Sequence, residues 1–277
     1  MKTIKRIKIN LSTYFVIALY IYSGYFYIFT LFFLTFLIHE LGHIFFIKLF
    51  HFKIEKIDVY PFGGIIKIDK KINCEIYKDL LISSGGFIFQ VIFIFINILF
   101  IRSKVLLNIN VLLILLNLIP LIPLDGSKIM FNLLSKYIPY YYSLKLLYFL
   151  NVIFYIVFLI YEIKNSSVNF ILATFLLIMF IKELKNKKML INMFYLERLL
   201  GDFHYKKVKY HQKVNLKKLK REELSFFFDK KLKNEQEILR NKFDNCSNIW
   251  YYYLRLKGFP GKTALKRFSI KKQTYVP

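Results

Sequence analysis

The sequence predicts an all-α polytopic membrane protein with about six transmembrane helices, a small membrane-associated β-hairpin and a basic cytoplasmic tail. Three observations predict this class. Of the 277 residues 56% are apolar and the mean hydropathy is +0.43, which is too apolar for a soluble domain of this size. The apolar residues form runs long enough to cross a bilayer, which takes about 20 residues. The net charge of +25 is concentrated near the two ends of the chain.

The first apolar run follows a basic N-terminal segment and extends from about residue 11 to residue 50. This run is twice as long as one span requires. We therefore expect two spans, roughly 11–22 and 26–50, with a turn at Tyr22-Ser23-Gly24-Tyr25 between them. We find no small-residue cleavage site after the basic segment, so we do not expect a removed signal peptide.

The second span contains the sequence His-Glu-Leu-Gly-His at residues 39–43. On a helix, His39 and His43 lie one turn apart on the same face, so both imidazoles can bind one metal ion. Glu40 follows the first histidine, where its carboxylate can reach a water molecule on that metal. Catalytic zinc has three protein ligands and a water whose pKa falls to about 7. The alternatives are a chance match or histidines that only form hydrogen bonds between helices. The cost of polar groups at membrane depth, about 2.5–3.5 kcal/mol for a charged residue, favours a functional role.

After the second span we expect two short strands, at residues 54–59 and 65–69, around Pro61-Phe62-Gly63-Gly64. They form either a hairpin against the membrane or a structured cytoplasmic loop. The third span is expected over residues 80–101. Its early Ser83-Ser84-Gly85-Gly86 sequence lets another helix approach closely or breaks the helix.

The fourth span, about residues 105–124, ends in the sequence NLIPLIPLDG at residues 117–126. Its two prolines cannot continue a regular helix. Irregular backbone at membrane depth must be covered by protein or line an aqueous cavity. An unpaired Asp125 carboxylate would be costly there, and a metal ion would satisfy it, whereas the simpler interpretation is a turn that ends the helix. Because the second and fourth spans run in the same direction, the histidines and Asp125 reach comparable depth, which favours the metal.

The fifth and sixth spans are expected at residues 144–161 and about 168–181. Six spans place both termini on one side, and their excess of Lys and Arg places that side in the cytoplasm. Residues 182–277 hold 25 Lys or Arg against 9 Asp or Glu. This excess favours contact with anionic lipid, and we expect no nucleic acid partner. Charge pairs at helical spacing predict a solvated helix over residues 219–242.

The HELGH sequence in the second span, together with NLIPLIPLDG at the end of the fourth, resembles the site-2 protease family of intramembrane zinc metalloproteases, in particular its sporulation branch. The resemblance covers residues 1–200, which would be the membrane-embedded metalloprotease domain. Residues 201–277 would be a basic cytoplasmic region in which the nucleotide-sensing CBS domain of relatives is degenerate or absent.

The resemblance implies one Zn²⁺ ion, with His39, His43 and Asp125 as its ligands and Glu40 as the general base. It also implies a substrate-binding segment beside the metal, formed by Asn117, Pro120, Pro123 and Gly126. Many relatives have a Gly-Pro…Asn pattern where this chain has Gly85-Gly86, with Gln90 as the nearest amide. The resemblance therefore assigns no oxyanion-binding role at that position.

The implied reaction is peptide-bond hydrolysis in a membrane-tethered protein, such as a pro-sigma factor during sporulation, with membrane regulatory proteins as further partners. The implied location is the bacterial cell membrane and, for the sporulation branch, the outer forespore membrane on its mother-cell side. The alternatives are a membrane metal-ion transporter or binding protein and an inactive scaffold. Glu40 argues against a pure binding site, which does not require a carboxylate that is not itself a ligand.

Overall fold

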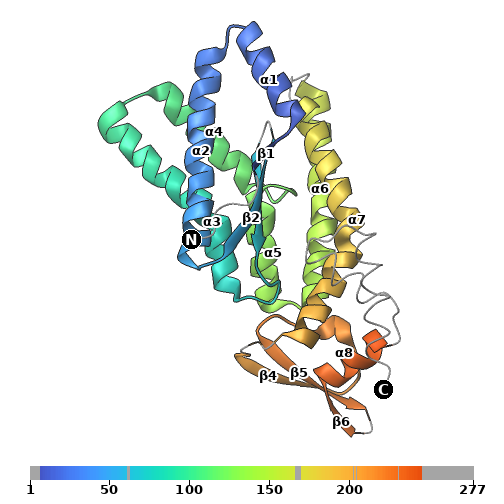
Figure 1. The fold of residues 1–277 in the computed structure, drawn as a ribbon. Coiled ribbons are helices and arrows are strands. Elements are labelled where there is room, and N and C mark those ends of the chain that lie inside the picture. The colour runs from blue at the N-terminus through green and yellow to red at the C-terminus, as the bar shows by residue number, and fades with distance from the viewer. Residues whose placement is uncertain are drawn as a thin grey trace, which may run out of the picture. The chain divides into compact units, whose positions relative to one another are not determined.

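The computed structural model is mostly helical with two small sheets, and it divides into two compact units (Figure 1). The first unit comprises residues 1–70, 76–133 and 147–180, and the second comprises residues 71–75, 134–146 and 181–277. The structure describes residues 7–60, 63–165, 170–201, 203, 205–229 and 231–244. The predicted turn residues Pro61 and Phe62, the basic residues 1–6 and the end of the tail at 245–277 lie outside the described residues.

The first two helices are α1, Leu11–Tyr22, and α2, Phe26–Leu49, close to the ranges expected for the first two spans. Gly24 lies in the turn between them with φ +75°, in the left-handed region that glycine enters without a steric penalty. The helix α2 buries the polar residues Thr35, His39 and His43 and exposes many of its apolar residues. Its buried side includes His39 and His43, whereas the side with Leu37, Leu41, Phe45 and Leu49 is exposed. This inverted pattern is typical of a helix surrounded by lipid.

The first sheet has the strand order β1-β2-β3, formed by Ile7–Ile9, Lys53–Tyr60 and Gly63–Asp69. Strands β2 and β3 are antiparallel, as the expected hairpin requires. Strand β1 pairs parallel to β2 and was not anticipated, because three residues beside a basic segment give no recognisable strand pattern. Within the hairpin, Val59 is opposite Gly64.

The helix α3, Ile76–Ile96, continues as a π-helical turn, Asn97–Ile101. It begins before residue 80 and is not broken at Gly85-Gly86, so of the two interpretations of this pair, close helix packing is correct. A Cβ atom built on Gly42 of α2 would lie 2.1 Å from the carbonyl oxygen of Gly85. The two helices therefore approach at a point where only glycine fits.

The helix α4 spans Lys104–Leu118 and α5 spans Asp125–Tyr137. The fourth span was expected over about residues 105–124, with regular helix interrupted by its two prolines, and α4 does end at Leu118, before both of them. The irregular segment between α4 and α5 is largely buried, with Leu121, Ile122 and Leu124 in the core. The backbone N–H of Ile122 donates to Asn151 Oδ1 over 2.7 Å, so this buried polar group is paired inside the protein.

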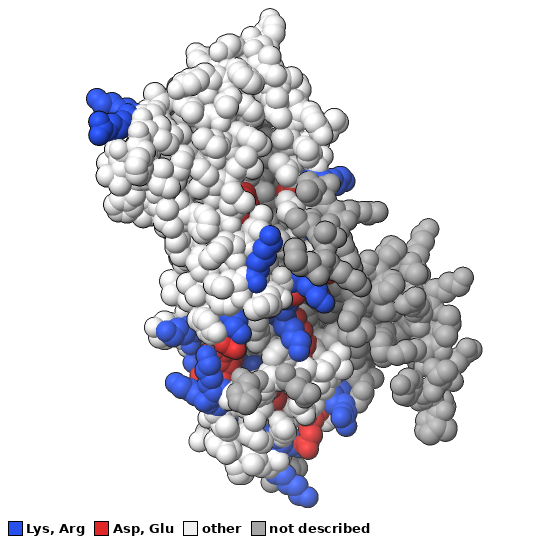
Figure 2. Space-filling model, turned by 60° about the vertical axis from the view of Figure 1, so that its left-hand side comes forward, with Lys and Arg blue, Asp and Glu red and all other residues white. Residues whose placement is uncertain are grey.

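The last two long helices are α6, Tyr140–Asn165, and α7, Phe170–Leu200. Three of the described helical segments are long and apolar enough to cross a membrane, namely Phe26–Leu49, Ile76–Ile101 and Tyr140–Ile160. Two shorter apolar helices, Thr13–Tyr22 and Lys104–Leu118, accompany them. Three spans are thus supported by length and composition, and six remain a prediction. In Figure 2 one part of the visible surface is almost free of charge, while Lys and Arg gather on the other part.

The second unit contains a sheet with the order β4-β5-β6, formed by Lys207–His211, Glu223–Asp229 and Lys231–Asn234. The helix α8, Glu235–Asp244, follows it. The expected solvated helix over residues 219–242 is therefore wrong up to Asn234, and only the part from Glu235 onward is helical. The charge spacing in that range was misleading, because Leu219, Phe227 and Leu239 are all buried and strand β5 lies between the other two strands.

A fully buried ion pair lies at the centre of the second unit. Arg198, near the end of α7, donates from Nη2 to Glu235 Oε2 over 2.7 Å, and neither side chain is exposed. The Arg198 guanidinium also donates to the backbone carbonyls of Lys220 and Glu223, and Glu235 accepts from the Ser225 N–H. The pair thus joins α7 and α8 to the strand β5.

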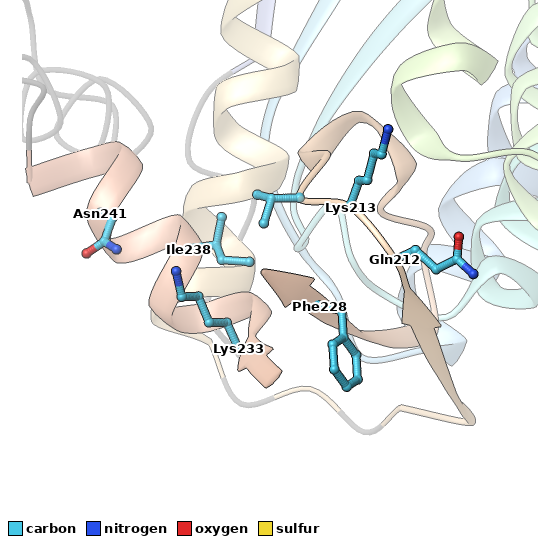
Figure 3. Close-up of a pocket in the computed structure, with 7 residues that line it drawn as sticks. Gln212, Lys213, Phe228, Lys233, Ile238 and Asn241 are labelled. Atoms are coloured by element: carbon cyan, nitrogen blue, oxygen red, sulfur yellow. The ribbon is translucent and has the colours of Figure 1, made fainter. Parts of the chain in front are cut away.

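The second unit also has a surface pocket of about 520 Å³ (Figure 3). Its described lining residues are Gln212, Lys213, Val214, Phe228, Lys233, Ile238 and Asn241. The polar ends of Gln212 and Lys213 point away from those of Lys233 and Asn241 in Figure 3. None of these lining residues is a histidine, cysteine or carboxylate, so they do not provide a metal site or a general acid–base pair.

Candidate metal centre

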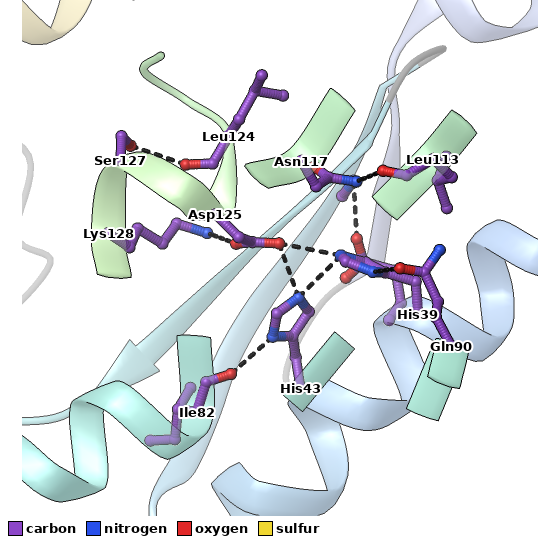
Figure 4. A network of polar contacts seen from close by, with 12 residues as sticks. His39, His43, Ile82, Gln90, Leu113, Asn117, Leu124, Asp125, Ser127 and Lys128 are labelled. Carbon is purple, nitrogen blue, oxygen red and sulfur yellow. Dashed lines mark hydrogen bonds and ion pairs between the residues drawn. The ribbon is translucent and has the colours of Figure 1, made fainter. Parts of the chain in front are cut away.

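The first unit brings together three buried side chains that can ligate a metal ion (Figure 4). His39 and His43 come from α2, and Asp125 is the first residue of α5. Asp125 Oδ2 lies 2.9 Å from the Nε2 atoms of both histidines, and these two Nε2 atoms lie 3.1 Å apart. The sequence placed these residues at comparable depth, and the structure places their donor atoms at one point.

The other ring nitrogen of each histidine faces a hydrogen-bond acceptor on α3. His39 Nδ1 lies 3.0 Å from Gln90 Oε1, and His43 Nδ1 lies 2.7 Å from the backbone oxygen of Ile82. Because both partners are oxygen acceptors, both Nδ1 atoms carry the proton and donate it. Each Nε2 therefore presents a lone pair toward Asp125, which is the state in which imidazole binds a metal.

The donor set fits zinc. Two imidazole lone pairs and a carboxylate oxygen converge without a proton between them, so they repel one another unless a positive charge lies among them. A proton on one imidazole would relieve some of this repulsion, whereas a divalent cation satisfies all three groups. Nitrogen and oxygen ligands of this kind are those of catalytic zinc sites, which keep a fourth position for water or substrate.

Two glycines bring α3 close enough for these contacts. A Cβ atom on Gly86 would lie 2.3 Å from Cε1 of the His39 ring, so the ring occupies the space of the missing side chain. Gly85 packs against Gly42 in the same crossing. The small residues noted in the third span therefore position the candidate metal ligands as well as the helices.

Asp125 is held at the start of α5 by its surroundings. Lys128, one turn further along the helix, donates from Nζ to Asp125 Oδ1 over 2.7 Å, which leaves Oδ2 to face the histidines. A Cβ atom on Gly126 would lie 2.3 Å from the carbonyl oxygen of Leu118, so the start of α5 packs directly on the end of α4. Gly126, predicted to bind substrate, thus lies within this packing.

Glu40 is half-buried and lies within electrostatic reach of both histidines and Asp125. Its Oε1 accepts a hydrogen bond of 3.3 Å from the backbone N–H of Gly64 in β3. The hairpin therefore contacts the carboxylate predicted to be the general base. This contact could not be predicted from the sequence, because it is made by the backbone N–H of Gly64 and not by a side chain.

The structure places the other predicted substrate-binding residues near the irregular segment that precedes Asp125. Asn117 donates from Nδ2 to the backbone oxygen of Leu113 in its own helix over 3.1 Å. Pro120 and Pro123 are half-buried. The role of these residues toward a substrate stays a prediction. Sequence reasoning missed the contacts of Asn110, Lys128 and Asn151, although buried amides within apolar spans are a signal that could have identified two of them.

Fold and site together define a class of protein, namely an apolar helical protein with a buried metal-binding centre and a carboxylate beside it. Comparison with known proteins shows which proteins the chain is similar to. The chain is 32% identical over 127 residues to a zinc metalloprotease of Methanocaldococcus jannaschii, covering 43% of this chain and 38% of that protein. It is 28% identical over 114 residues to stage IV sporulation protein FB of Bacillus subtilis, covering 38% of this chain and 39% of that protein.

A solved structure also resembles the chain, that of the site-2 protease from Methanocaldococcus jannaschii, with a TM-score of 0.51 and 26% identity. The match covers 66% of this chain and 93% of that structure. The chain spans about two fifths of the length of the two curated relatives. No family model matches it. These homologues confirm the resemblance to site-2 proteases, and together with the apolar helices they support a membrane protein.

Proposed function

We propose that the chain is an intramembrane zinc metalloendopeptidase that cleaves a membrane-tethered protein. The observation that carries this proposal is the convergence of three lone-pair donors, His39, His43 and Asp125, beside a carboxylate that is not among them. The relatives named zinc metalloprotease and site-2 protease support the same activity. Because the donors meet at one point, we propose a single zinc ion.

In this mechanism, zinc held by His39, His43 and Asp125 supplies Lewis acidity that polarises the scissile carbonyl and lowers the pKa of water. Glu40 takes a proton from the attacking water and delivers it to the leaving amine. The Gly64 N–H holds one oxygen of Glu40, which restricts where the carboxylate can point. Lys128 binds Asp125 Oδ1, which directs the other oxygen to the centre.

The irregular segment before Asp125 is the proposed place for substrate. A helical peptide bond is already hydrogen-bonded, so the substrate must leave regular helix next to the metal before it can be attacked. A chain interrupted at Pro120 and Pro123 offers non-helical backbone beside which an unwound peptide can lie. We propose that Asn117 and Gly126 border the same position.

We also propose a membrane topology and a location in the cell. Six spans, with residues 1–200 as the protease domain, place both termini in the cytoplasm of a bacterial cell. The basic region 201–277 then faces anionic lipid, and its excess of Lys and Arg supports this contact. Similarity to stage IV sporulation protein FB supports a role in sporulation. We propose a pro-sigma factor as the substrate, membrane regulatory proteins as partners and the outer forespore membrane as the location.

Co-expression with a candidate pro-sigma factor, for the wild type and Glu40→Gln, tests this function. A gel then follows shortening of the precursor. We expect shortening with the wild type alone, because the variant keeps the metal ligands and loses the proton acceptor. Equal shortening with both chains would contradict the proposed role of Glu40.

A further inference from the structure

One face of α3 is directed at the two histidines. Ile82, Gly86 and Gln90 follow one another at intervals of four residues, so they lie on the same side of the helix. The Ile82 carbonyl accepts from His43, Gly86 leaves room for the His39 ring, and Gln90 binds His39. Of these three residues, Gln90 alone forms a hydrogen bond with one of the two histidines through its side chain.

Gln90 is fully buried, and its Oε1 lies 3.0 Å from His39 Nδ1. Its backbone carbonyl accepts a second hydrogen bond, of 3.1 Å, from the Asn110 side chain in α4. A buried amide in an apolar helix is costly unless it is paired. The Gln90 side chain is paired with His39 through Oε1, while its Nε2 has no hydrogen-bond partner among the described residues, and its backbone carbonyl connects α3 to α4.

We propose that Gln90 is a positioning residue of the metal centre. Its oxygen holds the proton on His39 Nδ1, so that Nε2 keeps a free lone pair and the ring keeps its orientation. The hydrogen bond from Asn110 to the Gln90 carbonyl holds α3 in the position from which the Gln90 side chain reaches the His39 ring. This inference rests on the proposed zinc function and assigns to Gln90 a task toward one of the proposed ligands.

The amide suits this task because it accepts a hydrogen bond without adding charge. Leucine at position 90 would fill similar space but leave the His39 Nδ1–H without an acceptor. Glutamate would keep an acceptor at the same distance and raise the basicity of the imidazole, as carboxylates behind zinc-bound histidines do. A residue that served only helix packing would tolerate leucine at least as well as glutamate.

The test measures zinc affinity rather than proteolysis. The full chain in detergent is titrated with zinc against a competing chelator, for the wild type, Gln90→Leu and Gln90→Glu. Asn97→Leu is the matched control, because Asn97 is a buried amide of the same span that bonds with Ser103 at its end. Melting temperatures with chelator present show whether each variant folds.

We expect Gln90→Leu to weaken zinc binding by roughly 10–100-fold, the usual effect of removing the partner of a metal-bound histidine. Gln90→Glu should bind zinc at least as tightly as the wild type, and Asn97→Leu should match the wild type. Wild-type affinity in a folded Gln90→Leu chain, or equal weakening in Gln90→Glu, would overturn the proposal. A wild-type chain that binds no zinc would contradict the proposed function itself.

Discussion

At the scale of single residues, Asn97, Asn110 and Asn151 are amides buried in the apolar helices, and each has an identifiable hydrogen-bond partner. Asn151 accepts from a backbone N–H in the irregular segment, Asn97 bonds with the backbone of Ser103, and Asn110 donates to the Gln90 carbonyl. Lipid offers no hydrogen bonds, so each of these groups must be satisfied within the protein. Asn97 therefore marks the end of a helical span, whereas Asn110 and Asn151 mark points where separate segments meet.

The ligand set makes a direct prediction for metal content. His43→Ala and Asp125→Ala should each purify with little zinc, because they remove one of three converging donors. Glu40→Gln should retain about one zinc ion per chain, as a site with three remaining ligands does. Elemental analysis of the purified chains measures this difference. Full zinc content in Asp125→Ala would contradict its assignment as a ligand.

The contact between Gly64 and Glu40 predicts a defect in activity without loss of metal. A Cβ atom at Gly64 would lie 3.1–3.2 Å from the carboxylate atoms of Glu40, so Gly64→Val should displace this group. Displacement of a catalytic group by about 1 Å can reduce the rate roughly 100-fold. Cleavage rate and zinc content are measured together, with Ile66→Val in the same strand as control. Unchanged cleavage by the Gly64→Val variant would show that the hairpin does not position Glu40.

At the scale of elements, the crossing of α2 and α3 organises the centre. A methyl group on Gly42 would lie 2.1 Å from the Gly85 carbonyl oxygen, so the helices must separate to accept it. We expect Gly42→Ala to destabilise the protein by about 1–3 kcal/mol, as overpacking does, and to weaken zinc binding. Melting temperature and zinc affinity are the measurements, and Leu41→Ala on the exposed side of α2 is the control. A Gly42→Ala chain with normal zinc affinity would exclude this crossing as a determinant of the site.

Much of the element layout could be predicted from the sequence. Long apolar runs, the Gly24 turn, the proline-interrupted segment and the hairpin all have local signals, and the structure has each of them. Strands β1 and β4 were missed because each pairs parallel with a strand that is not its neighbour in sequence. Strands β5 and β6 are an antiparallel pair of neighbours, and they were missed because the charge spacing there favoured a helix. In residues 219–242 the charge spacing favoured a helix, while burial of Phe227 within a sheet decided the structure.

Part of the candidate site could likewise be predicted from the sequence, and part of it could not. His39, His43 and Asp125 could be predicted, since the motif spacing and the cost of charge at membrane depth both point to a metal. The contacts of Gln90, Lys128 and Gly64 could not be predicted, because they depend on how four separate elements meet. A sequence indicates that a polar residue needs a partner, but only the fold shows which one.

At the scale of the whole molecule, the second unit depends on its buried ion pair. Glu235→Gln would leave the Arg198 cation without its counter-charge in a site that excludes water. Breaking such a pair costs about 3–5 kcal/mol. We expect this variant to lose the folded second unit first, seen as early proteolysis within residues 205–244. Glu237→Gln, an exposed carboxylate on the same helix, should behave as the wild type. Equal protease resistance in both variants would show that the pair is not required.

We propose that this chain hydrolyses peptide bonds with a zinc ion at His39, His43 and Asp125 and with Glu40 as the general base. The most direct test is cleavage of a membrane-tethered substrate by the purified full chain, before chelation, after chelation and after zinc is restored. We expect cleavage to disappear with the chelator, to return with zinc, and to be absent from Glu40→Gln at every step. Cleavage that persists after the metal is removed, or that Glu40→Gln retains, would contradict the account.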